Sequence, residues 1–464
     1  METSPAAAAG GQGWSTLPAD LLLIAMSSME VPDVVRSGAV CASWRTAYAA
    51  FRLPTPRQAP CLLYYARDAC GGRATLYSPS TNATFRVPLL DEPSFAGGVI
   101  CSAAHGWLLV ADGAANPSLL NPLTGARAAL PPVTTLERVK GSSVDEDGGV
   151  VYDVDHSLCP GKPETRQVTA RRAQGWMYHR AAVSIPGADR DSVVVLLVHM
   201  PYKELSFARS GDDRWTSLSD LRPIDRHRGG HFDSVAYSHN DGRFYALQTT
   251  GAVHVLDLSR RPLPPAWLLA CTLTGYWSKC TPYLVPAPCG GDLLVVTRRW
   301  RRSGESPADR GSDADKYVTT TDIQIHKIDA VSFRMEKLAP GPGDRALFLG
   351  RNSALCLPIE RLPAPLSKRD CAYLTDDADS DTFSPMRRRD IGVWDFTSGT
   401  MEKLSDIGNG RDSYIMNEPV GSRQHSTPAD GLSSKIDGIL FHFIVRSCRE
   451  GLIASSADQD TISF

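Results

Sequence analysis

The sequence predicts two domains of different class: a small all-α module at the N-terminus, followed by a large all-β domain. Three observations predict this division. Apolar residues within 14–52 recur at helical spacing, whereas from Cys61 onward they form short runs separated by turn residues. The chain has 464 residues, which is too many for one ordinary core. Its 38 glycines and 33 prolines together make up about 15% of the chain, above the usual share of about 12%, and favour turn-rich β structure.

Residues 14–52 are expected to form three short helices, preceded by a disordered N-terminus at 1–13. Pro18 suits the first helical position, where its missing N–H would have no partner, and Asp20 complements the positive end of the helix dipole. Residues 21–26 are apolar almost all the way round the helix, so this helix needs cover on two sides. A module of about forty residues cannot bury that much surface alone. The rest of the chain or a partner should cover part of it.

The spacing of residue pairs in this module resembles an F-box, which docks on the Skp adaptor of cullin-RING ubiquitin ligases. Leu17-Pro18 and Leu21-Leu22 are followed by Val40-Cys41 and Trp44-Arg45. The resemblance implies that adaptor contacts come from these pairs and one neighbour on the first helix: Leu17, Pro18, Leu21, Leu22, Ile24, Val40, Cys41, Trp44 and Arg45. Some of these residues, Trp44 above all, could instead belong to the core of the module.

Two other interpretations of the module are a helical bundle packed on the next domain and a helix-turn-helix that reads DNA. The module balances three basic residues against three acidic ones: Arg36, Arg45, Arg52, Asp20, Glu30 and Asp33. A DNA reader needs an excess of basic residues for the phosphates, so the balance argues against it. The formal net charge of −2 likewise argues against a nucleic-acid or anionic-membrane surface.

A Pro-rich connector at 53–60, expected to be stiff and extended, leads into a β domain at 61–420. Four segments of this domain share a pattern of strand, polar turn and return strand: 78–88, 121–131, 327–338 and 395–404. The first two begin 43 residues apart, about the length of one propeller blade. Because the domain is also too long for one sandwich, we expect a propeller-like domain of six to eight blades.

Seven motifs in order give this domain a second resemblance, to the plant domain of unknown function 295, which commonly follows an F-box and is regarded as kelch- or propeller-like. The motifs lie at 178–184, 205–215, 232–247, 251–258, 346–353, 371–377 and 393–396. The sequence departs from the family after Asn417, where a Ser/Gly-rich spacer follows. Residues 421–464 are therefore expected to be a divergent tail. Its apolar stretch at 435–449 is expected to bind a partner or to be an altered tail, rather than a closing strand.

No catalytic, cofactor or metal site is predicted. The sequence lacks a Gly-x-Ser-x-Gly elbow, a phosphate-binding loop and a His-Glu-x-x-His helix. Gly229 and Gly230 lie between His227 and His231, and the acidic run at 376–381 lacks the glycine and glutamate of an EF-hand. The eleven cysteines form no CxxC pair, and three evenly spaced ones are expected in buried strands rather than at zinc: Cys271, Cys280 and Cys289.

The N-terminus has no signal-peptide pattern, and no apolar run reaches the roughly twenty residues of a membrane span. A nuclear and/or cytoplasmic protein with reduced thiols is expected. The predicted function is that of a non-catalytic substrate-recognition subunit of an SCF (Skp–cullin–F-box) ubiquitin ligase. The F-box would bind the Skp adaptor, and cullin through it, while the propeller-like domain binds an unknown target protein. The alternatives are a propeller scaffold acting outside a ligase and an enzyme of propeller architecture.

Overall fold

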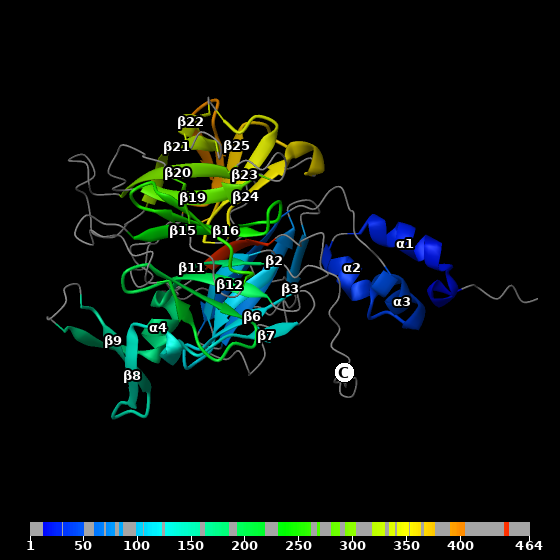
Figure 1. Ribbon diagram of the computed structural model, residues 1–464. Helices are drawn as coiled ribbons and strands as arrows, with labels where there is room; N and C mark the ends of the chain where they lie inside the picture. The colour runs from blue at the N-terminus through cyan, green and yellow to red at the C-terminus, as the bar shows by residue number, and fades with distance from the viewer. Residues whose placement is uncertain are drawn as a thin grey trace, which may run out of the picture. The chain divides into compact units, whose positions relative to one another are not determined.

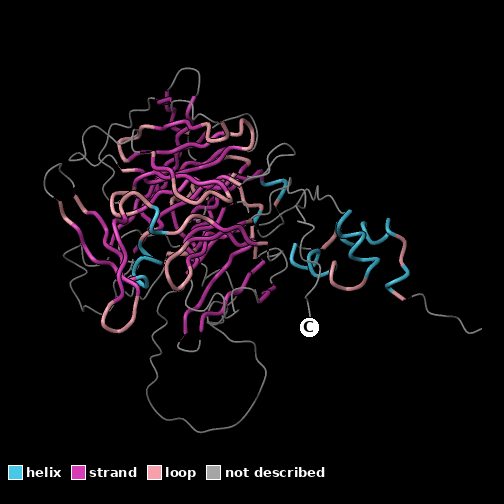
Figure 2. Tube along the Cα trace, turned by 60° about the horizontal axis from the view of Figure 1, so that its bottom comes forward, coloured by secondary structure: helices cyan, strands magenta, loops and turns pink. Residues whose placement is uncertain are grey.

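The computed structural model divides into two compact units, one with residues 1–58 and 446–464 and the other with residues 59–445. The structure describes residues 13–29, 31–50, 60–68, 71–78, 83–86, 99–104, 106–122, 126–157, 163–184, 193–218, 231–260, 267–269, 280–287, 293–302, 318–329, 334–338, 341–351, 353–362, 366–375, 390–403 and 440–444. We call residues 13–50 the helical module and residues 59–445 the β unit. Figure 2 shows that the β unit is built almost wholly of strands.

The helical module contains a short 3-10 helix followed by three α-helices: η1 (Trp14–Thr16), α1 (Ala19–Ser27), α2 (Val31–Ser37) and α3 (Ala42–Ala50). The three expected helices are present (Figure 1). Pro18 stands immediately before α1, with φ −54° and ψ 146°, rather than at the first helical position. Its carbonyl accepts the backbone N–H groups of Leu21 and Leu22, each at 3.1 Å. Pro18 is therefore the residue immediately before the helix, and its carbonyl accepts the first hydrogen bonds of α1.

The core of the helical module lies between α1 and α3. It consists of Leu22, Met26, Trp44 and Ala47. Gly38, which follows α2, allows the chain to pass close to α3, because an added Cβ would lie 2.8 Å from the ring of Tyr48. Any larger residue there would require the Tyr48 ring to shift.

The described strands of the β unit form seven sheets, and each sheet is named by its first strand. The β1 sheet has the order β28-β1-β2-β3, formed by β28 (Leu440–Ile444), β1 (Cys61–Asp68), β2 (Gly71–Ser78) and β3 (Ala83–Arg86). The β4 sheet contains β4 (Val99–Ala104), β5 (Trp107–Ala111), β6 (Pro117–Leu120) and β7 (Arg127–Ala129). The β8 sheet has three strands, β8 (Val139–Val144), β9 (Val150–Asp155) and β10 (Thr165–Thr169).

Four more sheets follow along the chain, three with four strands and one with five. The β11 sheet contains β11 (Tyr178–Val183), β12 (Val194–His199), β13 (Glu204–Arg209) and β14 (Thr216–Ser217). The β15 sheet contains β15 (Phe232–Ser238), β16 (Arg243–Gln248), β17 (Val253–Leu256) and β18 (Trp267–Leu269). The β19 sheet contains β19 (Cys280–Pro286), β20 (Leu293–Arg302), β21 (Val318–Asp329) and β22 (Arg334–Lys337). The β23 sheet contains β23 (Arg345–Leu349), β24 (Leu355–Pro358), β25 (Cys371–Leu374), β26 (Gly392–Asp395) and β27 (Thr400–Lys403).

Neighbouring strands are antiparallel throughout these sheets, except that β23 and β25 are parallel. All four segments expected to be hairpins pair as antiparallel strands, and each forms the last two strands of its sheet: β2–β3, β6–β7, β21–β22 and β26–β27. The repeated pattern in the sequence therefore reports a repeated structural unit.

The first strands of successive sheets lie side by side: β4 against β11, β11 against β15, and β15 against β19. Figure 1 shows β11, β15 and β19 in successive layers. The hydrophobic core lies between these sheets. One cluster joins the β11 and β15 sheets through Phe207 and Phe244, and another joins the β19 and β23 sheets through Tyr283 and Leu347. The β unit is thus a series of face-packed sheets, as a propeller-like domain requires.

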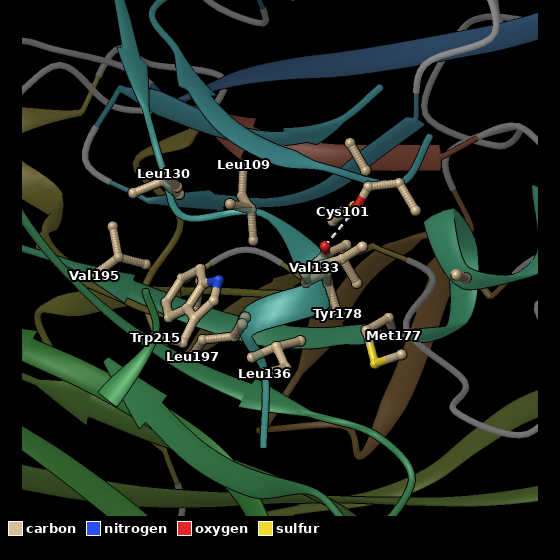
Figure 3. Packing of buried hydrophobic residues seen from close by; sticks show 14 of the residues in the cluster. Cys101, Leu109, Leu130, Val133, Leu136, Met177, Tyr178, Val195, Leu197 and Trp215 are labelled. Atoms are coloured by element: carbon tan, nitrogen blue, oxygen red, sulfur yellow. Dashed lines mark hydrogen bonds between the residues drawn. The ribbon is translucent and has the colours of Figure 1, made fainter. Parts of the chain in front are cut away.

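The β8 sheet and α4 (Ala170–Trp176) lie in the chain between the β4 and β11 sheets. One hydrophobic cluster joins their apolar side chains to those of both neighbouring sheets. Leu109 of β5 and Trp215, just before β14, belong to this cluster, as do Val133 and Leu136 between β7 and β8 (Figure 3). The turn between β5 and β6 is also bonded to this region, because its carbonyls accept hydrogen bonds from the side chains of Tyr152, Gln174 and Tyr178. The sequence around residues 134–180 gave little indication of this sheet.

A run of arginines such as 298–302 is typical of a surface loop, but these residues belong to β20, which continues to Arg302 and buries Arg298. One expectation for the β unit is corrected. The stretch 435–449 was expected not to be a strand, yet residues 440–444 form β28 and pair with β1 in the register Tyr64↔Phe441. An unpaired β1 edge would expose a row of backbone N–H and C=O groups, and β28 covers that edge. The metal candidates His227, Cys271, Cys289 and 376–381 lie outside the described residues.

Candidate adaptor-binding surface

Two of the nine predicted contact residues lie in the core of the helical module. The exposed fraction of Leu22 is 1% and that of Trp44 is 6%. The indole Nε1 of Trp44 also donates a hydrogen bond to the carbonyl of Trp14 at 3.1 Å. A side chain that is closed off by its own module cannot form an anchor for a partner without unfolding. Leu22 and Trp44 therefore support the surface from beneath, and the prediction that they contact the adaptor is not supported by their burial.

Three predicted apolar residues point outward instead. Leu21 is 49% exposed, Ile24 is 64% exposed and Val40 is 61% exposed. Leu21 and Ile24 are three residues apart on α1, so they lie on one face of that helix. The alternation of Leu21 and Leu22 between solvent and core shows how α1, apolar on nearly all sides, divides its side chains between the module and its surroundings.

The remaining predicted residues lie at the margins of this surface. Pro18 and Arg45 are exposed, whereas Leu17 and Cys41 are half-buried against the core of the module. Arg45 Nε donates to the carbonyl of Gly38 at 3.4 Å, so the guanidinium is held near the end of α2. The surface thus combines exposed aliphatic side chains with one positioned cation.

Trp14 belongs with this surface, although the sequence-based set omitted it. Its side chain is 75% exposed, while its backbone is fixed by Trp44. Ser43 Oγ strengthens the same junction by donating to the carbonyl of Ser15 at 3.0 Å. Two hydrogen bonds from α3 therefore hold η1 in place while the indole of Trp14 faces solvent. The signal in the sequence that could have identified Trp14 is an aromatic residue shortly before the Leu17-Pro18 pair.

The distribution of exposed apolar side chains distinguishes the module from the β unit. Five large apolar side chains are exposed in the described parts of the chain: Trp14, Leu21, Ile24, Val40 and Val144. Four of them lie in the helical module, which is by far the smaller unit. Single exposed apolar residues are normal, but the concentration of four of them on one small module makes that module the candidate interaction surface.

One serine–histidine pair in the β unit has the spacing of a catalytic pair but not its surroundings. His199 Nε2 lies 3.0 Å from Ser206 Oγ, and both residues are only 1% exposed. The other ring nitrogen, Nδ1, faces the carbonyl of Met200 rather than a carboxylate. Burial lowers the pKa of His199 and keeps the ring neutral. The pair is closed to substrate and lacks the orienting acid of a catalytic triad, so it is a structural hydrogen bond.

One buried group of charged side chains in the β unit has a structural role. Arg138 donates to Glu204 at 2.6 and 2.9 Å and to Asp155 at 3.2 Å, which joins the β8 sheet to β13. The hydrogen bonds that Arg138 donates to Glu204 raise the pKa of Arg138. Within the described ranges, no three His, Cys, Asp or Glu side chains are placed to hold a metal ion. Among those same residues, no helix has the length and apolar character needed to cross a bilayer.

A small helical module with an exposed apolar surface, followed along the chain by a unit of face-packed β-sheets, defines a two-domain architecture. The family model for the KIB1-4 beta-propeller matches residues 76–395, well over half of the chain, so the chain belongs to that family. This result supports the propeller-like architecture. It names the KIB1-4 propeller rather than the domain of unknown function 295.

Relatives of similar length match most of the chain. The chain is 26% identical over 422 residues to F-box protein SKIP23 of Arabidopsis thaliana, covering 85% of this chain and 92% of the relative. It is 23% identical over 417 residues to a putative F-box protein of the same plant, covering 84% and 92%. A solved structure of PorZ from Porphyromonas gingivalis has 12% identity over 61% of this chain and 29% of that chain, with a TM-score of 0.28, too low to support an argument. The F-box relatives suggest an adaptor or receptor rather than a catalytic protein.

Proposed function

We propose that this protein is the substrate-recognition subunit of an SCF ubiquitin ligase in the nucleus and/or cytoplasm. The helical module binds a Skp-type adaptor, and through it cullin, while the β unit binds a target protein for ubiquitination. Support comes from the F-box proteins among its relatives and from the exposed apolar surface of the module. No step of this function requires chemistry from the chain itself. The protein acts by raising the effective concentration of target at the ligase.

The exposure of Leu21, Ile24 and Val40 is the observation that carries this proposal. Each side chain is about half to two-thirds exposed, although the module beneath them has a closed core of Leu22 and Trp44. Burying one such aliphatic side chain completely is worth about 1.5–3 kcal/mol. The module therefore keeps in solvent an apolar surface whose burial on a partner would be strongly favourable.

Binding of the full chain to a purified Skp-type adaptor, measured by calorimetry, tests the proposal. The double variant Leu21→Ala/Ile24→Ala should weaken binding by about 2 kcal/mol or more, or roughly thirtyfold, because central anchors of an interface cost at least this much. Neither side chain belongs to the module core, so the variant should remain folded. A Leu21/Leu22 pair would be a poorer choice, since Leu22 is a core residue.

Val144→Ala provides the matched control. Val144 is 67% exposed on β8 in the β unit, so the substitution removes an equally exposed aliphatic side chain away from the module. The control should bind the adaptor as the natural protein does. Equal affinity of the natural protein and a folded Leu21→Ala/Ile24→Ala variant would reject the adaptor surface. Target capture without adaptor or cullin would indicate a scaffold instead.

The arrangement of sheets supports a finer proposal for the β unit, namely six blades with β28 as the innermost strand of the β1 sheet. Six sheets have four or five strands, while the three-stranded β8 sheet is an insertion between the β4 and β11 sheets. In this arrangement β28 lies against β4, just as β4 lies against β11. Truncation before residue 440 should then lower the unfolding temperature of the β unit. An unchanged temperature would contradict closure by β28.

A further inference from the structure

Within the described part of the chain, the end of β20 carries a run of arginines that the function above does not use. In the sequence 298–302 (Arg-Arg-Trp-Arg-Arg), four of five residues are arginines, with no lysine. The strand β20 pairs with β19 as far as Cys280↔Arg299, and Trp300 to Arg302 pair with β21. We call residues 299–302 and 318–322 the arginine hairpin.

The base of the arginine hairpin is anchored by a buried ion pair. Arg298 Nη2 lies 2.9 Å from Asp390 Oδ2, and the two side chains are 2% and 1% exposed. Arg298 Nε donates to Thr320 Oγ1 at 2.8 Å, and Thr320 N donates to the same Asp390 oxygen at 2.6 Å. Asp390 belongs to the neighbouring β23 sheet region, just before β26. These bonds join both strands of the hairpin to a second sheet and fix its direction.

Two arginines of the hairpin are exposed to solvent beyond this anchor. Arg299 and Arg301 are exposed, and Trp300 between them is half-buried. The indole Nε1 of Trp300 donates to Thr281 Oγ1 on β19 at 3.2 Å, so the ring is held in one orientation. The pairing with β21 shifts register at the same point: Arg299 pairs with Asp322 and Trp300 with Thr320, so Thr321 of β21 is the extra residue of a β-bulge. Bulges of this kind redirect side chains and occur near binding sites.

We propose that Arg299, Trp300 and Arg301 bind an acidic segment of a protein target. Arginine presents a planar fork that matches carboxylates, and arginine and tryptophan are the residues most enriched among the anchors of protein interfaces. The ring of Trp300 supplies the apolar contact, and the two guanidinium groups supply charge complementarity. A nucleic acid is the less favoured partner, because the chain as a whole carries a formal net charge of −2.

Fluorescence anisotropy with the full chain tests this inference. The probes are a short labelled peptide rich in Asp and Glu, the same peptide with Asn and Gln in their place, and a labelled single-stranded RNA. The acidic peptide should bind, and Arg299→Ala/Arg301→Ala should weaken its binding at least about tenfold, with binding falling as salt rises. Arg299→Lys/Arg301→Lys should retain only part of the affinity, since lysine keeps the charge but loses the fork.

The matched control is Arg171→Ala/Arg214→Ala, which removes two exposed arginines from α4 and the loop before β14. It has the same change in net charge and should leave peptide binding unchanged. Equal losses in both double variants, no binding of the acidic peptide, or equally tight binding of RNA would each overturn the inference. The inference rests on the proposed function only for the identity of the partner as a ligase target. Because the assay omits the Skp-type adaptor, its outcome is independent of adaptor binding.

Discussion

The helical module and the β unit differ in where their apolar side chains lie. In the module, a core of Leu22, Met26, Trp44 and Ala47 is closed, yet Leu21 and Ile24 remain in solvent on the same helix. In the β unit, apolar side chains lie between sheets, and Val144 is the large apolar residue that its described part leaves exposed. The β unit instead exposes charge at the arginine hairpin. Our two proposals assign these surfaces to two kinds of binding, one through apolar side chains and one through cationic side chains.

The largest expected effect comes from removing the core of the module. Trp44→Ala should destabilise the module by about 3–5 kcal/mol, because it leaves a cavity and removes the hydrogen bond to the carbonyl of Trp14. Hydrogen exchange of the amides of α1 and α3 should accelerate. Leu21→Ala, on the same module, should leave their exchange nearly unchanged. Similar exchange in the two variants would show that the division between core and surface is wrong.

A comparable loss is expected from breaking the buried ion pair of the β unit. Asp390→Ala leaves Arg298 charged, buried and without its carboxylate partner, which should cost about 3–5 kcal/mol. Urea unfolding should show the loss, whereas exchange in the helical module should be unaffected. The double variant Arg298→Met/Asp390→Ala should recover much of the stability, since no charge remains buried. Failure to recover would mean that the pair contributes more than its mutual compensation.

An intermediate effect is expected where the β8 sheet joins β13. Arg138→Met leaves Glu204 and Asp155 without the buried guanidinium and should cost about 3 kcal/mol. Arg166→Met removes a guanidinium 2.5 Å from Glu164, but those side chains are 64% and 52% exposed. Its cost should be below about 1 kcal/mol, because solvent screens exposed pairs. Urea unfolding of both variants compares them directly, and equal losses would contradict the assigned role of burial.

The smallest effect concerns the turn between β26 and β27. Asp395 accepts the backbone N–H groups of Ser398 and Thr397, at 3.0 and 2.7 Å, which lowers the pKa of its carboxyl below the ordinary 3.8. A group with a lowered folded-state pKa stabilises above its unfolded pKa and loses that contribution as pH falls through the folded value. Asp395→Ala should therefore cost about 1 kcal/mol or less at neutral pH. The difference should shrink below about pH 4, and a constant difference across pH would contradict this account.

Much of the architecture could be predicted because it depends on local patterns. The change from helical spacing to short strands gave the boundary near residue 60, and the four hairpins followed from polar turns between apolar runs. The sequence could not decide which side of α1 faces inward, because residues 21–26 are apolar on nearly every side. Leu22 is 1% exposed and its neighbour Leu21 is 49% exposed, a choice made by packing against α3.

The features that could not be predicted depend on residues far apart in the sequence. Arg298 lies in a run of arginines that is typical of a surface, and only Asp390, 92 residues later, explains its burial. The strand β28 pairs with β1 at the other end of the β unit, so its own sequence does not reveal its partner. Trp14 was missed for a related reason, since two hydrogen bonds from α3 position its backbone.

Hydroxyl-radical footprinting of the full chain, with and without a Skp-type adaptor, tests most directly the claim that the apolar surface of the helical module binds that adaptor. The method reports the exposure of individual side chains. Trp14, Leu21, Ile24 and Val40 should be oxidised in the free protein and protected in the complex, while Val144 should be oxidised equally in both. Unchanged oxidation of the four module residues in a saturated complex, or protection of Val144 in their place, would contradict the account.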